Sequence, residues 1–174
     1  MSKAKPIYII LFILLTITMW IVVFPISIEK ALEKQGWNKA FLTVELESDS
    51  VLLFMEEEKG KIRLASAYRG LFGWKIADNT GLLSVNSDVE GFSGSEGSIL
   101  IKNDNKLHYL FGIIVDEDID SMTYKTNKIT KEKMINTFTT QNGTRIYYST
   151  HEQEFGDVTY IAYNHQNELV YSKP

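Results

Sequence analysis

The chain has 174 residues, no cysteine and a net charge of −4; 44% of its residues are hydrophobic and 23% are charged. This balance predicts a folded chain rather than a disordered one, and an acidic chain without a basic stripe argues against nucleic acid as a partner. The lack of cysteine excludes disulfides, thiolate metal sites, a thiol nucleophile and a lipid-modified cysteine.

The first predicted element is an apolar run at residues 7–24 that carries no charge. Its 18 residues reach the length at which such a run becomes a transmembrane-helix candidate. A cleaved signal peptide is one alternative, but it would have a shorter apolar core and a small-x-small cleavage site, which residues 22–27 lack. A buried core helix is the other, although a helix without a polar face is unusual in so small a protein. We therefore predict an anchor in the lipid bilayer.

The charges before the run predict its orientation. Lys3 and Lys5 are the charged side chains that precede it, and the positive-inside rule keeps such an end in the cytoplasm. The predicted location is the cell membrane, crossed once, with the C-terminal domain outside the cytoplasm. The predicted parts are a cytoplasmic tail at 1–6, a transmembrane anchor at 7–24, a helical linker at 25–38 and an extracytoplasmic β domain at 39–174.

A short helix and then a series of strands are predicted after the anchor. Ser27 suits the N-cap and Gly36 suits the end of a helix over residues 27–35. Residues 42–46 alternate apolar and polar side chains, which predicts a half-buried strand, with a helix over 38–47 as the alternative. Further strands are predicted at 51–57, 62–68, 71–77, 82–85, 99–102, 107–115, 122–126, 134–141, 144–150, 158–163 and 168–172.

Turn signals separate these strands. Residues 78–81 (D-N-T-G) predict a turn, and the glycine- and serine-rich segment 86–98 predicts a loop. Short strands at this spacing predict a mainly β fold, arranged as an antiparallel β-sandwich or an open barrel.

The segment around residue 140 carries two competing signals. Residues 128–136 alone fit the start of a helix. Asn142-Gly143 favours a β-hairpin instead, because both residues accept the positive φ of a two-residue turn. That turn would set Phe138 directly opposite Tyr147 on the neighbouring strand.

The histidines and acidic residues match no metal motif completely. His151-Glu152 begins like the zinc motif H-E-x-x-H, but Phe155 stands in the place of the second histidine. The three aspartates of residues 116–120 alternate as in a calcium loop, yet the glycine and the closing glutamate of that loop are missing, so we favour a solvated turn. We therefore predict no metal, no cofactor and no catalytic residue.

One stretch, R-G-L-F-G-W-K at residues 69–75, has large apolar side chains bracketed by glycines and cations. One hypothesis is an exposed contact for an envelope protein or a glycan, formed by Arg69, Phe72, Trp74 and Lys75. The alternative is a glycine-bent strand in which Phe72 and Trp74 fill the core.

Several short motifs together resemble a known group of proteins. They are the strand at 51–54, L-F-G-W-K at 71–75, Y-L-F-G-I-I-V-D-E-D-I at 109–119, R-I-Y-Y at 145–148 and A-Y-N-H-Q-N-E-L-V-Y at 162–171. Over residues 28–172 the chain resembles small exported or membrane-anchored proteins of Gram-positive bacilli that have no established activity. The resemblance implies a location and a fold, and no reaction.

Three functions remain open at the level of the sequence. The first is a membrane-anchored extracytoplasmic binding or regulatory domain at the bacterial cell envelope. The second is a structural subunit of a membrane complex. The third is a cell-envelope hydrolase, which would need a deep pocket that holds two or more of a set of polar residues. That set is Asp116, Asp118, His151, Glu152 and Glu154.

Overall fold

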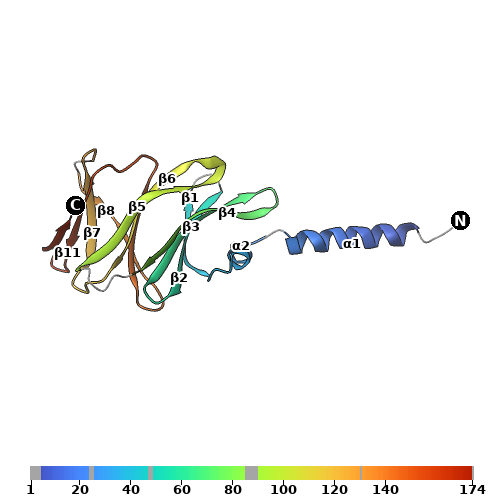
Figure 1. The fold of residues 1–174 in the computed structure, drawn as a ribbon, viewed down its shortest axis with the longest axis horizontal. Helices are drawn as coiled ribbons and strands as arrows, with labels where there is room; N and C mark the ends of the chain where they lie inside the picture. Colours follow the sequence, from blue (N-terminus) through green and yellow to red (C-terminus); the bar gives the residue numbers. More distant parts are fainter. Residues whose placement is uncertain (1–4, 24–25, 47–48, 85–89, 130, 174) are drawn as a thin grey trace.

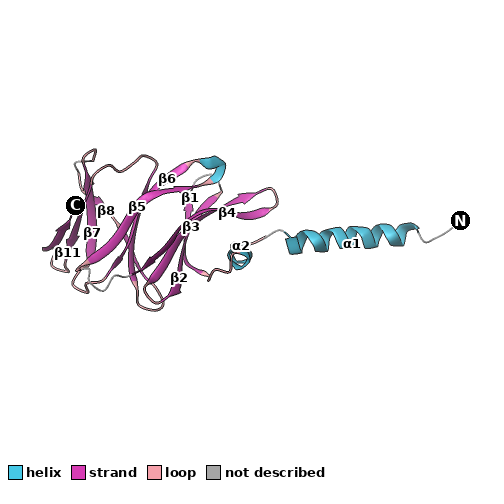
Figure 2. Cartoon of the chain, in the orientation of Figure 1, coloured by secondary structure: helices cyan, strands magenta, loops and turns pink. Residues whose placement is uncertain are grey.

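A computed structural model describes residues 5–23, 26–46, 49–84, 90–129 and 131–173 of the chain. This part forms two α-helices, one 3₁₀ turn and twelve strands. Figures 1 and 2 show how they are arranged. The helices are α1 (Lys5–Val23) and α2 (Ile28–Lys34), and the 3₁₀ turn is η1 (Lys102–Asp104). The strands are β1 (Ala40–Leu46), β2 (Ser50–Glu58), β3 (Lys61–Gly70), β4 (Gly73–Ser84), β5 (Phe92–Leu100), β6 (Lys106–Ile114), β7 (Ser121–Thr126), β8 (Lys133–Met134), β9 (Asn136–Thr139), β10 (Arg145–His151), β11 (Val158–Tyr163) and β12 (Leu169–Lys173).

The strands form three antiparallel sheets of four strands each. The first sheet has the order β1-β2-β3-β4, the middle sheet β5-β6-β10-β9 and the third sheet β12-β11-β7-β8. The sheets lie in layers, with the middle sheet between the other two (Figure 1). The prediction of a mainly β, antiparallel fold is confirmed.

The middle sheet supplies side chains to two cores because alternate residues of a strand point to opposite faces. On β6, Phe111 packs with Phe54 of the first sheet, at 5.6 Å between ring centroids. The preceding residue, Leu110, faces the opposite core, which contains Tyr124 of the third sheet. Strand β6 therefore has both faces buried, which is typical of a central strand and fits its nearly continuous apolar sequence.

The short helix α2 covers the outer face of the first sheet. The Ser27 hydroxyl accepts a hydrogen bond from the Lys30 amide at 3.3 Å and caps the helix, which ends before Gly36 at a φ of +70°. Ala31 and Leu32 are buried against a cluster of side chains from β2 and β3. The predicted cap, helix and glycine stop are all confirmed.

Helix α1 projects away from the layered sheets (Figure 1). Its side chains are described from residue 8 to residue 19, and they are exposed. In the described residues no helix meets both the length and the hydropathy needed to cross a bilayer. Residues 1–4 of the predicted tail and residue 24 of the predicted anchor lie outside the described part.

The predicted turn at residues 78–81 is wrong, because β4 runs through it as one strand. The pairing of β3 with β4 shifts register here, so the turn-like residues form an irregularity within the strand. Gly81 takes a φ of +76°, and the Asp78 carboxylate accepts a hydrogen bond from the Leu100 amide at 3.0 Å. Turn-forming residues are equally suited to a bulge, which explains the error.

The predicted loop at residues 86–98 is wrong for its second half, which belongs to β5; residues 85–89 lie outside the described part. The glycines that suggested a loop are sites of close contact with tyrosines. A side chain at Gly94 would collide with the Tyr147 hydroxyl, and one at Gly97 would approach the Tyr109 hydroxyl at 2.8 Å. A tyrosine that packs over a glycine stabilises the strand, although the glycine-rich composition of this segment disfavours one.

The hairpin around Asn142-Gly143 exists, but its loop is one residue longer than predicted. The Thr140 amide donates to the Thr144 carbonyl at 2.8 Å, which leaves three residues between them. Phe138 therefore lies opposite Ile146 instead of Tyr147. A one-residue shift moves a side chain to the other face of a sheet. The described residues of 128–136 form no helix; they include β8 and the start of β9.

Candidate functional site

The stretch at residues 69–75 forms the end of the β3–β4 hairpin. Gly70 pairs with Gly73, so Leu71 and Phe72 alone make the turn. Gly73 has a φ of +110°, which a side chain would disfavour. Leu71 is 88% exposed and Phe72 is 44% exposed. We call Leu71 and Phe72 the hairpin tip.

The other three predicted contact residues lie on the strands below the hairpin tip. Trp74 is half-buried and packs on the cluster that α2 covers, directly opposite the exposed Arg69. Lys75 is exposed and lies opposite Tyr68. The two rings of this stretch thus differ, since Phe72 is exposed while Trp74 is half-buried against a core cluster. Leu71 is not among the predicted contact residues, although the G-L-F-G spacing indicates a tight turn that would expose it.

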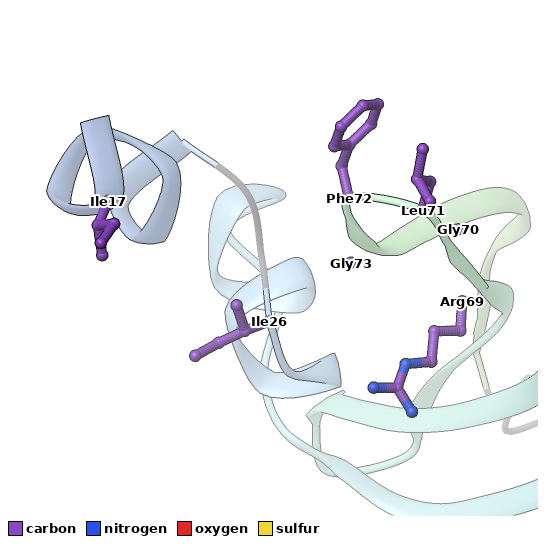
Figure 3. A pocket seen from close by; sticks show the side chains of 7 residues that line it. All are labelled: Ile17, Ile26, Arg69, Gly70, Leu71, Phe72 and Gly73. Atoms are coloured by element: carbon purple, nitrogen blue, oxygen red, sulfur yellow. The ribbon is translucent and has the colours of Figure 1, made fainter. Parts of the chain in front are cut away.

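The hairpin tip borders a hollow of about 370 Å³ that reaches α1. Ile17 of α1 and Ile26 of the linker line it together with residues 69–73. Figure 3 shows the Leu71 and Phe72 side chains pointing away from the sheet, while Ile17 lies on the neighbouring helix. This hollow therefore joins the exposed apolar end of the β domain to the first helix.

A second hollow, of about 440 Å³, lies between the middle and third sheets. We call it the β5–β11 cleft. Its lining residues are Phe92, Gly94, Ser95, Glu96, Tyr147, Asp157, Val158, Tyr160 and Lys173.

Two tyrosines with hydrogen-bonded hydroxyls, Tyr147 and Tyr160, line the β5–β11 cleft. Burial raises the pKa of both phenols, and the nearby Glu96 carboxylate raises that of Tyr160 further. Both hydroxyls therefore stay protonated at any physiological pH and act as neutral hydrogen-bonding groups.

Charged side chains surround the opening of the cleft. The Asp157 carboxylate accepts a hydrogen bond from the Asn127 amide at 2.9 Å. The Lys173 ammonium lies 5.2 Å from the centre of the Phe92 ring and donates to the Glu90 carbonyl. Glu96 is exposed on β5 and faces the cleft. The cleft thus presents both negatively and positively charged side chains to a ligand.

The acidic corner at residues 116–120 makes contacts within the protein. Tyr171 donates a hydrogen bond to the Asp116 carboxylate at 2.6 Å and holds its pKa below the usual range. The Asp120 carboxylate lies 2.8 Å from Nδ1 of His165. Within the described ranges, no group of three or more histidine and acidic side chains is placed to hold a metal ion.

The residues of the hydrolase hypothesis do not meet in one pocket. His151 and Glu152 line a shallow hollow beside Leu107, whereas Glu154 lines another one with His108. Asp116 is held at the corner by Tyr171. The pairing of β6 with β10 does place His108 directly opposite His151. This proximity could not be predicted from the sequence, because the two histidines are far apart along the chain.

Comparisons of the chain with protein-family models, with curated proteins and with solved structures found no match. The resemblance to small proteins of Gram-positive bacilli therefore stays a prediction.

Proposed function

We propose that this chain is a single-pass membrane protein whose β domain binds a partner at the cell envelope, outside the cytoplasm. The uncharged run at residues 7–24, after Lys3 and Lys5, supports the anchor and its orientation. The partner of the β domain is an extended polypeptide segment of another envelope protein, bound in the β5–β11 cleft.

The observation that carries this proposal is the open edge of β5 beside the cleft. Among the described strands β5 pairs with β6 alone, and Gly94, Ser95 and Glu96 are exposed. An edge strand carries backbone N–H and C=O groups that can pair with an added strand. The small residues Gly94 and Ser95 leave room for a second backbone, and this kind of strand addition is a common way to bind peptides.

The chemistry of the cleft favours a polypeptide over a glycan. Sugar binding commonly uses an exposed aromatic face, but Phe92 is only 6% exposed and Tyr147 only 1%. The neutral Tyr160 hydroxyl and the Glu96 carboxylate suit polar and cationic side chains of a bound segment. The hydrolase hypothesis has no comparable support, because its acidic residues are scattered over several parts of the surface. The structural-subunit hypothesis has none either, because no described surface favours it.

A photoreactive residue at Ser95 of the full-length protein, in its own membrane, tests the cleft. We expect a discrete adduct whose attached segment maps to one peptide of the partner. The same residue at Thr43, exposed on the edge strand β1, serves as the control position. Glu96→Lys should abolish the adduct, whereas Glu45→Lys, the same charge change on β1, should not. Equal adducts at both positions, or an adduct that Glu96→Lys leaves intact, would refute the proposal.

The orientation has a separate test that uses the lack of native cysteine. In intact cells a membrane-impermeant maleimide should label Leu169→Cys, because Leu169 is 62% exposed in the β domain. It should label Ser2→Cys only after the membrane is permeabilised. The opposite pattern would place the β domain in the cytoplasm.

A further inference from the structure

The hairpin tip presents the most exposed large apolar side chain outside the two helices among the described residues, Leu71. We propose that Leu71 and Phe72 insert into the outer leaflet of the bilayer beside α1, so that the β domain touches the membrane at a second point. The inference rests on the membrane anchor of the proposed function, and it concerns a different surface from the β5–β11 cleft.

The chain keeps the β domain close to the end of α1. Five residue steps separate Val23, the last residue of α1, from Ile28, the first of α2. A fully extended chain covers at most about 3.6 Å per residue, so this connection spans no more than about 18 Å. Helix α2 is itself held on the first sheet by the buried Leu32. The first sheet therefore stays next to the membrane surface from which the anchor emerges.

The hairpin tip also lies near the C-terminal end of α1 (Figure 1). Ile17 and both residues of the tip line the same hollow. Ile17 precedes the end of α1 by six residues, which corresponds to about 9 Å along a helix. In Figure 3 the tip and Ile17 stand on opposite sides of this hollow. If residues 7–24 cross the bilayer, the tip therefore lies close to the surface at which the span ends.

The residues around the tip suit a phospholipid interface. Exposed apolar side chains favour transfer into the acyl region, and an aromatic ring is well accommodated near the headgroups. Arg69 and Lys75 are exposed on the strands just below the tip. Long cationic side chains in such positions extend toward lipid phosphates while their stems remain in apolar surroundings. The apolar tip thus matches the acyl region of a leaflet, and the flanking cations match its headgroup region.

The test places a polarity-sensitive fluorophore at Leu71→Cys in the otherwise cysteine-free, full-length protein, reconstituted in phosphatidylcholine vesicles. The matched control is Leu169→Cys, 62% exposed on β12 of the third sheet. Because both positions are exposed, the substitutions leave the core intact. We expect a blue-shifted emission at position 71 and at least threefold stronger quenching by spin-labelled lipids than at position 169.

Extraction with alkaline carbonate separates the possible failures. If the protein resists extraction but position 71 is quenched no more than position 169, the tip does not touch lipid and the inference is overturned while the anchor stands. If carbonate releases the protein, the anchor is wrong and the inference falls with it. If native membranes shield position 71 from both water-soluble and lipid quenchers, a protein covers the tip, which also overturns the inference.

Discussion

Glu56 offers a sharp test of how the first and middle sheets are joined. Its carboxylate on β2 accepts hydrogen bonds from the Thr144 hydroxyl at 2.6 Å and the Asn142 amide at 3.0 Å, both in the β9–β10 loop. It also accepts one from the Gly60 amide at 3.3 Å. We predict that Glu56→Gln destabilises the protein while preserving the size of the side chain.

The expected loss follows from the partners of each carboxylate oxygen. In the variant, the amide oxygen can replace the oxygen that faces Thr144 and Gly60, so these bonds change from charge-assisted to neutral. The new NH₂ group then meets the NH₂ group of Asn142, donor against donor. A hydrogen bond to a charged group contributes about 1.5–3 kcal/mol and a neutral one about 0.5–1.5 kcal/mol. We expect a total loss of about 2 kcal/mol in the free energy of unfolding.

The loss should depend on pH. Burial alone would raise the pKa of Glu56, but the donors, Thr144 foremost, outweigh it and lower the pKa below the ordinary value of 4.5. A carboxyl with a lowered pKa in the folded state stabilises it fully above the ordinary pKa. That contribution disappears as the pH falls through the lowered value. The difference between wild type and variant should therefore be constant near neutral pH and shrink in acid.

Urea unfolding of the full-length protein in detergent, followed by tryptophan fluorescence, measures this difference. With a slope of about 2 kcal/mol per molar urea, the midpoint should fall by about 1 M at pH 7. Glu58→Gln is the control, since Glu58 is exposed and its close partner is Lys61 on the same hairpin. An unchanged midpoint for Glu56→Gln at pH 7, or a loss that is as large in acid, would refute the reasoning.

Two further substitutions test the cores by the same urea unfolding assay. Phe54→Ala should cost about 3–5 kcal/mol, because the ring is fully buried and contacts Phe111 and Tyr148; a loss under 1 kcal/mol would mean that the two sheets do not pack there. Gly112→Ala should cost about 1–3 kcal/mol, because a methyl group would collide with the Tyr147 ring. Gly70→Ala, where the nearest neighbour would lie at 3.6 Å, should cost much less, and equal losses at both glycines would contradict the packing argument.

The elements with a clear local pattern were predictable from the sequence. Helix α2 has a capping serine and a terminal glycine, and the β2–β3 hairpin turns at Lys59-Gly60, where Gly60 has a φ of +74°. Strand β6 is apolar on both faces because a sheet covers each of them. In these cases the local preference and the tertiary structure agree.

The errors arise where distant residues decide the structure. Strand β5 has the composition of a loop, yet it pairs with β6 along its whole length. Its glycines lie against Tyr109 of β6 and Tyr147 of β10, the strand beyond β6 in the sheet. Those contacts join segments that the sequence separates, so no local pattern contains them.

For the candidate sites, too, local patterns were informative and contacts between distant residues were not predictable. The sequence singled out the residues around the hairpin tip, but only the register of β3 with β4 separates the exposed Phe72 from the packed Trp74. The β5–β11 cleft was missed altogether, because two sheets contribute its walls.

The order of the three sheets along the chain has a consequence for folding. The first sheet is a continuous meander, so its contacts are local and form with little loss of chain entropy. The middle and third sheets are interleaved instead: the chain completes half of each, with β5–β6 and β7–β8, before β9–β10 and β11–β12 complete both. Because synthesis proceeds from the N-terminus, the first sheet can form first, whereas neither of the other two sheets is complete until the last strands have been made. We expect two kinetic phases, with the slow one set by the arrival of β10 and β11.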